Sequence, residues 1–313
     1  MKRLLFSHKS DIDGMGEVIL SIIAFGDIDY ILCTNVSDLE NKFLEEYNSG
    51  RLYDYDIIYI TDLSLRENVA KMVFADNQIK DKLYIFDHHE TALDSGLNNY
   101  PTCTIKIENE IGTMCATQIY YEYLIENNYI SKSKILDDFV EMVRREDVWE
   151  WKKYNDQASH DLSILFNVIG CEKYIETMTD KLINNLDKAF FYSDEEISII
   201  EEKKKITIEK VHNFLKYLKV VEIDGIKVGI CFIVYEYRNE VGDYLKEHRD
   251  EYDIDVVAMI ALDNSQVSLR STHGNGYARI VAEKFGGGGH DNAAALPITN
   301  EIKEKMINQI FNF

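Results

Sequence analysis

Three short segments of the sequence carry carboxylate and imidazole side chains just after runs of residues that are typical of buried strands. The segments are SHKSDIDG with His8, Asp11 and Asp13, ITDLS with Asp62, and FDHH with Asp87, His88 and His89. The preceding runs are almost continuously apolar, which favours strands that are buried on both faces. In an open parallel sheet, ligands bind beyond the carboxyl ends of the strands. We therefore expect these side chains to converge at one edge of a parallel sheet.

A cluster of this composition is typical of a divalent metal site. Several carboxylates within a few ångströms of each other cannot all ionise unless a cation compensates their charge. Asp and His ligands without a thiolate suit Mn²⁺, Mg²⁺, Zn²⁺ or Fe²⁺. Four carboxylates and two imidazoles are too many for one ion. They fit two ions about 3.5–4 Å apart, which is the arrangement in which a two-metal-activated hydroxide hydrolyses a phosphoester.

Each segment also has a simpler interpretation when it is taken alone. An aspartate after a strand is most often a helix N-cap, and this applies to Asp13 and Asp62. Adjacent histidines are more often surface residues than ligands. The three segments nevertheless occur in order on consecutive strand–helix turns, and that combination favours the metal site.

A second group of candidate binding residues lies near the C-terminus. Four glycines at 286–289 precede His290, and glycine allows a backbone to take positive φ and to approach a ligand closely. Free amides of such a turn bind anions. Arg270 ends a predicted strand in the same region, and arginine is the preferred partner of phosphate. A flexible loop and a solvated strand end are the simpler alternatives. We expect the substrate-binding residues to be Arg270, Gly287, Gly288, Gly289 and His290.

The elements that must position these residues form an α/β pattern in the first half of the chain. Strands alternating with helices of about ten residues indicate βαβ units and a parallel sheet. The segment 112–186 has helical periodicity, and the Glu- and Lys-rich segment 193–219 reads as one long helix. Strands are expected at 2–7, 30–34, 56–61 and 82–86, and helices at 15–25, 37–47 and 66–75.

The pattern changes after residue 219. Asp224–Gly225 is a hairpin signal between strands at 220–223 and 227–234. A second strand pair is expected at 254–262 and 266–271, followed by a helix at 277–285, the glycines, a short strand and a terminal helix. These elements predict a smaller, separate α/β domain.

Composition and charge exclude several classes of protein. The 313 residues include 34 Lys and Arg and 55 Asp and Glu, a net charge of −21, which disfavours wrapping of long nucleic acid. No run of about 18 apolar residues exists, which excludes a membrane span, and the first apolar stretch is too short for a signal peptide. Five cysteines without a C-x-x-C pair argue against a disulfide framework. We expect a reduced, cytoplasmic protein.

The sequence resembles the DHH phosphoesterase superfamily, and specifically the subfamily with a C-terminal DHHA1 domain. The motifs SHKSDIDG, ITDLS, FDHH and FGGGGHDNAAA carry the resemblance, from residue 7 to residue 295. It implies an N-terminal parallel-sheet DHH catalytic domain with a helical extension at 1–190 and a helical linker at 191–219. A smaller α/β DHHA1 substrate-binding domain would follow at 220–313, with a cleft between the two domains.

The resemblance also implies roles for the acidic and imidazole residues. His8, Asp11 and Asp62 would hold a first ion, and Mn²⁺ is favoured by the imidazole ligands. Asp62 would bridge to a second ion, held in addition by Asp13, His88 and one further aspartate. Asp87 would orient the imidazole of His88, and His89 would contact the scissile phosphate. For the further aspartate we choose Asp147 in RREDVWEW; Asp137, Asp138 and Asp156 are the alternatives.

These implications lead to a functional interpretation. We expect a metal-dependent phosphodiesterase that hydrolyses short oligonucleotides to mononucleotides. The alternatives are a phosphatase or phosphodiesterase acting on small nucleotides, such as 3′-phosphoadenosine 5′-phosphate or dinucleotides, and a catalytically inactive DHH binding module. Every ligand type is present, which disfavours the inactive module. The expected partners are short RNA or DNA or small nucleotides and no membrane, and a homodimer is left open.

Overall fold

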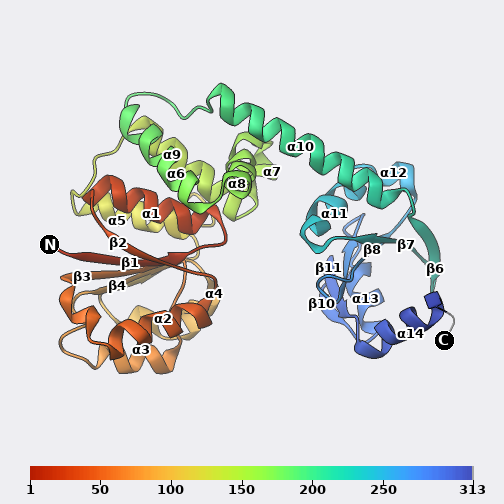
Figure 1. Ribbon diagram of the computed structural model, residues 1–313, viewed down its shortest axis with the longest axis horizontal. Coiled ribbons are helices and arrows are strands. Elements are labelled where there is room, and N and C mark those ends of the chain that lie inside the picture. Colours follow the sequence, from red (N-terminus) through yellow and green to blue (C-terminus); the bar gives the residue numbers. More distant parts are fainter. Residues whose placement is uncertain (312–313) are drawn as a thin grey trace. The chain divides into compact units, whose positions relative to one another are not determined.

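The computed structural model describes residues 1–311 of the chain, which divides into two compact units, Met1–Ile200 and Glu201–Phe313 (Figure 1). The break between the units falls inside helix α10 (Asp194–Leu215). This helix lies within the segment 191–219 that the sequence predicts as a helical linker.

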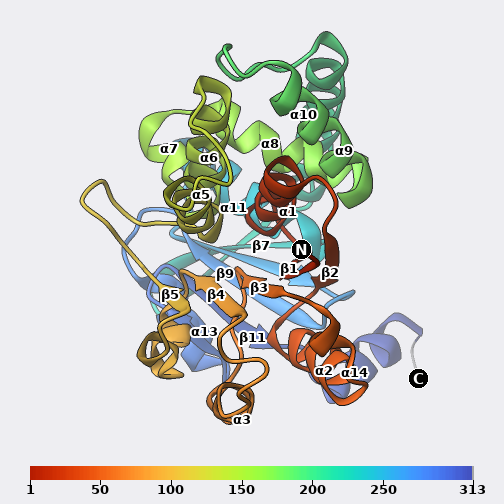
Figure 2. The same cartoon turned by 90° about the vertical axis from the view of Figure 1, so that its left-hand side faces the viewer.

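The first unit is built on a five-stranded sheet in which every neighbouring pair is parallel. The strand order is β2-β1-β3-β4-β5, and Figure 2 shows the strands side by side in this order. The expected α/β fold with a parallel sheet is confirmed. The sequence analysis missed β5, which has only three residues. The strands are β1 (Arg3–His8), β2 (Asp29–Cys33), β3 (Ile57–Thr61), β4 (Leu83–Asp87) and β5 (Cys103–Ile105).

Helices cover both faces of this sheet (Figure 1). Because successive side chains of a strand point to opposite faces, Leu5 packs in the core under one helical layer and Leu4 and Phe6 in the core under the other. One layer consists of α1 (Ile12–Phe25), α5 (Ala116–Glu126), α6 (Lys134–Asp147), α8 (Gln157–Ile169) and α9 (Cys171–Asn184), and the other of α2 (Val36–Asn48) and α3 (Glu67–Phe74). The short helices are η1 (Arg51–Asp54), α4 (Glu90–Asp94), η2 (Leu97–Asn99) and α7 (Glu150–Tyr154).

The strand order places a topological switch point between β1 and β3. From β1 the chain continues to β2, which pairs with one edge of β1, and it later returns to β3, which pairs with the opposite edge of β1. The crevice beyond the carboxyl ends of such a strand pair is where open α/β sheets bind ligands. The acidic and imidazole segments follow β1, β3 and β4, so the topology brings them to this crevice.

The second unit contains a six-stranded mixed sheet of order β10-β11-β9-β8-β7-β6, in which only β7 and β8 are parallel. The predicted hairpin is present, and Asp224 and Gly225 both have positive φ, 51° and 81°, as a type I′ turn requires. The strands are β6 (Lys219–Ile223), β7 (Ile226–Ile233), β8 (Val256–Ala261), β9 (Gln266–Ser271), β10 (Gly288–His290) and β11 (Ala293–Pro297).

Two helices of the second unit pack on opposite faces of this sheet. Val241 and Leu245 of α11 share a core with Val257 and Met259 of β8, while α13 packs on the opposite face. The helical elements are η3 (Tyr235–Tyr237), α11 (Arg238–Glu247), α12 (Arg249–Tyr252), α13 (Tyr277–Lys284) and α14 (Asn300–Phe311). Within residues 1–311, no helix combines the length and the apolar character needed to span a bilayer.

Gly14 allows α1 to begin directly against the end of β1. A Cβ atom at Gly14 would lie 2.1 Å from the carbonyl oxygen of His8 and 2.7 Å from its carbonyl carbon. These are backbone atoms of a buried strand, so they have little freedom to move aside. The glycine therefore sets the distance between the two elements that carry His8, Asp11 and Asp13.

We predict that Gly14→Ala destabilises the protein, because the added methyl group forces α1 away from β1. The free energy of unfolding should fall by about 1–3 kcal/mol, as is usual for overpacking. Urea unfolding followed by circular dichroism measures this change. Gly288→Ala is the matched control, since a Cβ there meets no atom within 4 Å, and its effect should stay within about 0.5 kcal/mol. Equal effects of the two substitutions would contradict the close-approach argument.

Candidate metal centre

His8 and Asp11 face each other at the turn from β1 to α1. His8 is the last residue of β1, and its Nδ1 lies 2.7 Å from Asp11 Oδ2 and 3.2 Å from Asp62 Oδ2. Asp11 is the N-cap of α1 and accepts a hydrogen bond from the backbone N–H of Gly14 with its other oxygen, at 3.1 Å. The cap fixes the carboxylate so that the Oδ2 atom stays turned toward the imidazole.

Asp13 is fully buried and its carboxylate is held by the start of another helix. Its two oxygens accept hydrogen bonds from the backbone N–H groups of Ala116 and Thr117, both at 2.8 Å. These residues begin α5, whose N-terminus favours a negative charge. Asp13 therefore caps α5 rather than its own helix, and its Oδ2 also lies 3.7 Å from His88 Nε2.

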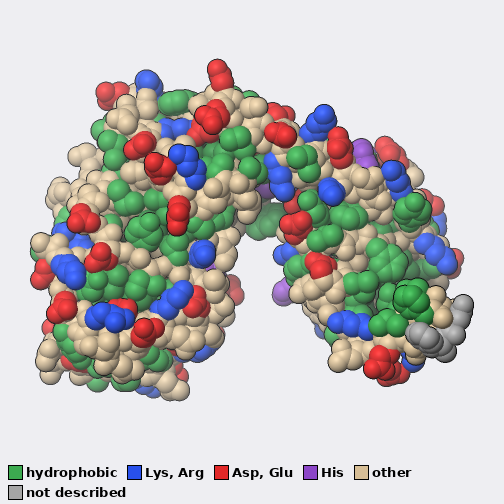
Figure 3. All heavy atoms as spheres, viewed as in Figure 1, with side chains coloured by type: hydrophobic (Ala, Val, Ile, Leu, Met, Phe, Trp, Pro, Cys, Tyr) green, Lys and Arg blue, Asp and Glu red, His purple; other side chains and the backbone are tan. Residues whose placement is uncertain are grey.

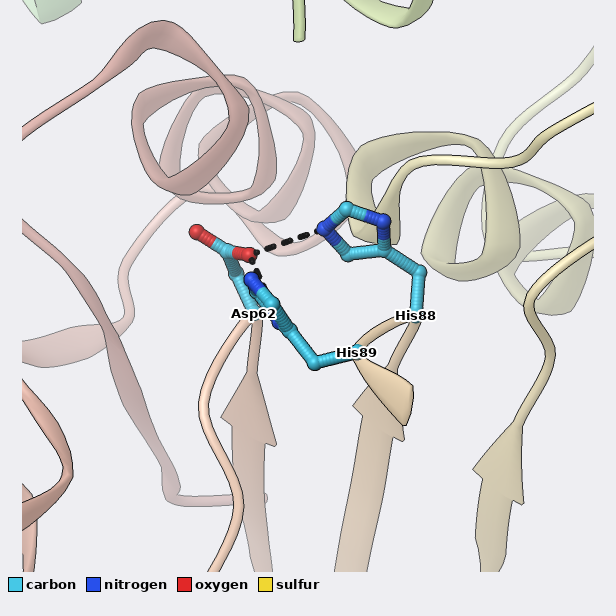
Figure 4. Close-up of side chains that lie close together, drawn as sticks. All are labelled: Asp62, His88 and His89. Carbon is cyan, nitrogen blue, oxygen red and sulfur yellow. Dashed lines mark ion pairs between the residues drawn. The ribbon is translucent and has the colours of Figure 1, made fainter. Parts of the chain in front are cut away.

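Asp62 lies between the other ligand candidates. It follows β3 with a φ of 56°, the left-handed region that non-glycine residues rarely adopt. One carboxylate oxygen lies 3.2 Å from His8 Nδ1, and the other lies 3.5 Å from His88 Nε2 and 3.9 Å from His89 Nδ1. Figure 4 shows both imidazoles, which follow β4, turned toward this carboxylate. Asp62 thus faces two groups of donors at once.

Asp147, the last residue of α6, brings a fourth carboxylate to the cluster. Its Oδ2 lies 3.5 Å from His88 Nε2. Both of these atoms are buried and neither has a hydrogen-bond partner, which a bound cation would supply. The end of α6 is fixed by Arg144, a residue that the sequence analysis did not single out, which is buried and pairs with Glu141 and Glu150.

The alternative aspartates lie elsewhere and are engaged by other groups. Their partners are a tyrosine, a lysine and an arginine that do not belong to the cluster. Asp137 accepts from Tyr121, Asp138 pairs with Lys134, and Asp156 pairs with Arg145.

The contacts of Asp87 differ from those that the family resemblance implies. We expected this carboxylate to orient the imidazole of His88. Instead, Oδ1 accepts from the backbone N–H groups of His88 and His89 and lies 2.8 Å from Nδ1 of the His89 ring. Its other oxygen accepts from the hydroxyl of Ser64. The tight turn after β4 brings the second imidazole, and not the first, to Asp87.

The donor atoms form three sets, in each of which all atoms lie within 4.8 Å of one another. Such distances suit atoms that share a divalent cation, and the donors are the oxygen and imidazole type that Mn²⁺ or Zn²⁺ accepts. The residues present therefore fit a metal centre. The sets are His8, Asp11 and Asp62; Asp13, His88 and Asp147; and Asp62, His88 and His89.

Burial and mutual repulsion act on the carboxylates of this cluster. Burial, followed by the nearby charge of Asp13, raises the pKa of Asp62 to about 6. The same two causes hold the pKa of Asp147 well above its usual range. The carboxylates are therefore costly to ionise together without a cation.

The pKa values of the His8 and His88 imidazoles shift in the direction that favours their protonated, positively charged forms. Burial lowers the pKa of His8 and His88, but the close approach of the surrounding carboxylates outweighs it and raises both pKa values to about 10. Without a cation, the protonated imidazoles take over part of the charge compensation. Metal binding would have to displace those protons.

Glu17 is a buried acid that the sequence analysis missed. It lies one helical turn after Asp13, is fully buried, and its Oε2 is 2.8 Å from the hydroxyl of Ser7. Burial and the charges of Asp13 and Asp62 raise its pKa well above the usual range. The only signal in the sequence was an acidic residue on the apolar side of α1, and its importance becomes evident only from the packing around it.

Arg270 and His290 lie on the same face of the second unit's sheet. Ala293 of β11 is paired with Arg270 of β9 on one side and with His290 of β10 on the other. Directly paired residues of antiparallel strands share a face. The two predicted substrate-binding side chains are thus separated by one small residue.

The four glycines do not form the turn of free amides that we expected. The backbone N–H of Gly286 donates to Glu283 and that of Gly287 to Ala282, so both close the end of α13. The next two glycines belong to β10, which pairs with β11. Glycine is required here because of close packing, since a Cβ at Gly287 would lie 2.2 Å from the carbonyl oxygen of Ala295.

A pocket of about 420 Å³ opens beside the first unit's cluster. Its volume lies in the range of small-molecule sites. Its wall includes Asp62, Asp87 and His89 together with Ser64, Arg66 and Thr91.

Comparison with known proteins identifies relatives across nearly the whole chain. No protein-family model matches it. It is 30% identical to oligoribonuclease NrnB of Bacillus subtilis over 314 residues, which cover 98% of this chain and 75% of NrnB. It is 25% identical to the uncharacterized protein R106 of Acanthamoeba polyphaga mimivirus, covering 85% of this chain and 58% of that protein.

Two solved structures share the fold. The pGpG-specific phosphodiesterase PggH of Vibrio cholerae aligns with a TM-score of 0.55 at 14% identity, covering 100% of this chain and 98% of PggH. Exonuclease RecJ bound to manganese aligns with a TM-score of 0.54 at 12% identity, covering 99% of this chain and 89% of RecJ.

We predict that the metal-free protein loses stability as the pH rises. His8 and His88 bind protons more tightly in the folded state, so their contribution is full below pH 6.5 and is lost as the pH approaches about 10. The raised pKa of Asp62 gives the same trend between pH 3.8 and about 6. In EDTA, the melting temperature should therefore fall between pH 6 and pH 9, as measured by differential scanning calorimetry.

Mn²⁺ should act in the opposite direction, because the ligands must lose protons before they bind a cation. The gain in melting temperature over EDTA should be small at pH 6 and larger at pH 8. Asp62→Asn, which removes a shared ligand, should lose most of this gain. A gain that is the same at all pH values would contradict the assignment of the imidazoles as ligands.

Proposed function

The chain belongs to the DHH/DHHA1 phosphoesterase family, and from this premise we propose that it is a metal-dependent phosphodiesterase that hydrolyses short oligonucleotides to mononucleotides. It is a hydrolase of phosphoric esters, like its relative oligoribonuclease NrnB. The observation that carries the proposal is the juxtaposition of two donor sets around Asp62.

We assign the ligands of two divalent cations, with Mn²⁺ as the metal, from these donor sets. His8, Asp11 and Asp62 would hold one ion, and Asp62 would also contribute to the other. When bound, a pair of such ions supplies an activated water nucleophile and positive charge for the phosphoryl oxygens. The ligands of the second ion would be Asp13, Asp62, His88 and Asp147.

His89 is suited to contact the scissile phosphate. Its side chain is 52% exposed, whereas that of His88 is 12% exposed. The hydrogen bond to Asp87 raises the pKa of His89, which favours the protonated imidazole. With Nδ1 held by Asp87, Nε2 is the nitrogen that would donate to a phosphoryl oxygen.

The substrate's other groups would be bound by residues of the second unit. We assign this role to Arg270 and His290, with Gly287, Gly288 and Gly289 serving to hold His290 close against β11 rather than to offer free amides. A local site of this kind suits a short substrate in a chain of net charge −21. On the face shown in Figure 3, basic and acidic side chains are interspersed on both units. The cytoplasmic location and the homodimer stay predictions.

We predict that Asp62→Ala abolishes turnover, because both ions would lose a shared ligand. The kcat value should fall at least about 10³-fold. The measurement uses purified protein with Mn²⁺ and 5′-labelled RNA of two, five and twenty-four nucleotides beside 3′-phosphoadenosine 5′-phosphate. Asp27→Ala, an exposed aspartate of the same unit, is the control and should behave as wild type.

The substrate panel distinguishes the alternatives. Rapid loss of the two short RNAs with slow loss of the long one is expected. Turnover of the bisphosphate alone would replace the proposal with a small-nucleotide phosphatase. Normal activity of Asp62→Ala would refute the two-ion arrangement.

We predict that His89→Ala lowers kcat about 10²- to 10³-fold with little change in KM, because its hydrogen bond strengthens as charge develops on the phosphoryl oxygens. Steady-state kinetics on a dinucleotide checks this. His212→Ala, a substitution in the second unit, should leave kcat unchanged. A change in KM alone would assign His89 to binding instead.

A further inference from the structure

Glu17 and Ser7 form a buried polar link between α1 and β1. Glu17 lies on α1, Ser7 is next to last in β1, and both side chains are fully buried. The hydroxyl oxygen of Ser7 lies 2.8 Å from Glu17 Oε2 and 2.8 Å from the backbone carbonyl oxygen of Gly14. Both distances are those of good O–H···O hydrogen bonds. One strand side chain is thus bonded to two points on the helix.

The number of hydrogens in this link determines which group donates. A serine hydroxyl has one hydrogen, and a carbonyl oxygen can only accept. If Ser7 donated to an ionised Glu17, its oxygen would face the carbonyl oxygen of Gly14 at 2.8 Å with no hydrogen between them. Both contacts are hydrogen bonds only when a neutral Glu17 donates to Ser7 and Ser7 donates to Gly14. The geometry therefore fits a neutral carboxylic acid at Glu17.

The surroundings of Glu17 agree with a neutral side chain. Other buried glutamates of the described chain pair with a cation, Glu40 with Arg66 and Glu196 with Lys181. Within residues 1–311, Glu17 forms no ion pair with a basic side chain. Burial of an unpaired carboxylate is far more costly than burial of a neutral acid that is hydrogen-bonded.

The link ends on residues that are adjacent to the ligand candidates. Ser7 directly precedes His8, and Gly14 directly follows Asp13. The backbone N–H of Gly14 donates to Asp11 Oδ1 at 3.1 Å, while its carbonyl oxygen accepts from Ser7. A shift of Gly14 away from Ser7 would therefore change the spacing between His8 and the two aspartates.

We propose that Glu17 is a positioning residue of the metal centre, which as a neutral hydrogen-bond donor holds α1 against β1 and so keeps the ligands of these two elements at the spacing that binds cations. The inference rests on the proposed function and adds to it a residue that acts through Ser7 and Gly14. A metal site requires its ligands to stay within about 0.5 Å of the productive geometry. Gly14 allows the two elements to approach, and the link from Glu17 keeps them together.

The test measures the dissociation constant of Mn²⁺ by titration calorimetry with the full-length protein. Glu17→Ala removes the link, so this constant should rise about 10- to 100-fold, as is usual when a residue that orients metal ligands is lost. Turnover of a dinucleotide should fall at limiting Mn²⁺ and recover when the ion is raised above the new dissociation constant. A role in folding alone would not produce this dependence on the ion.

The conservative variant distinguishes a neutral donor from a charged carboxylate. Glu17→Gln keeps the size of the side chain, and its amide N–H can donate to Ser7. Its dissociation constant for Mn²⁺ should stay within about threefold of the wild-type value, because the amide replaces the hydrogen bond of the neutral acid. Ser7→Ala breaks the link at its centre and should reproduce the effect of Glu17→Ala.

Ser21→Ala is the matched control. Ser21 lies one turn further along α1, is fully buried, and shares a hydrogen bond of 2.9 Å with the hydroxyl of Tyr120. Its loss should lower the melting temperature of the protein. The dissociation constant for Mn²⁺ should stay within about twofold of the wild-type value, because this hydrogen bond does not involve Ser7 or Gly14.

Three outcomes would overturn the inference. Equally weak binding by Glu17→Gln and Glu17→Ala would show that a charged carboxylate is needed. Wild-type affinity in Glu17→Ala, or an equal loss in Ser21→Ala, would assign Glu17 to folding alone. If Glu17→Ala does not fold, the comparison of Ser7→Ala with Glu17→Gln decides: weak binding by the first and normal binding by the second support the inference, and equal binding overturns it.

Failure of the proposed function gives a different result. In that case wild type would bind Mn²⁺ and hydrolyse no dinucleotide. The dissociation constants of the variants would still decide the positioning role, because they do not depend on turnover.

Discussion

Mutual repulsion among buried carboxylates is the constraint around which the first unit is arranged. Asp13 and Asp62 are almost completely buried, and Asp147 and Asp11 lie beside them. Such a group is stable only when hydrogen bonds, protonated imidazoles or cations compensate its charge. The structure provides the first two, and the unpaired atoms of His88 and Asp147 indicate where the third would act.

Each carboxylate is held by local contacts or backbone geometry of the fold that do not depend on a bound metal. Asp11 caps α1, Asp13 caps α5, and the left-handed backbone at Asp62 turns its side chain into the cluster. Gly14 lets α1 begin against β1. These features fix the positions of the carboxylates before a cation binds, which favours tight and selective binding.

The second unit shows the opposite arrangement. Within the described residues, the guanidinium groups of Arg238 and Arg270 form no ion pair with a carboxylate. Arg238 lies over the ring of Tyr235, and the side-chain stem of Arg270 lies against Gly242. In a strongly acidic chain these two side chains are positive charges that no carboxylate of the described residues neutralises. Affinity for a small anion then comes from local geometry, while the net charge of −21 disfavours extended polyanions.

The sequence by itself determined the α/β fold and the strand-end positions of His8, Asp11, Asp62 and the FDHH segment, because buried strands and the turns that follow them are encoded locally. The family resemblance already favoured Asp147 over three other aspartates, but only the tertiary structure showed that its carboxylate lies beside His88. Only the tertiary structure, likewise, paired Asp87 with the His89 ring and placed two of the glycines in a strand pair. Glu17 and Arg238 escaped notice for the same reason. Their significance depends on burial and on neighbours distant in the sequence, and local patterns carry no record of either.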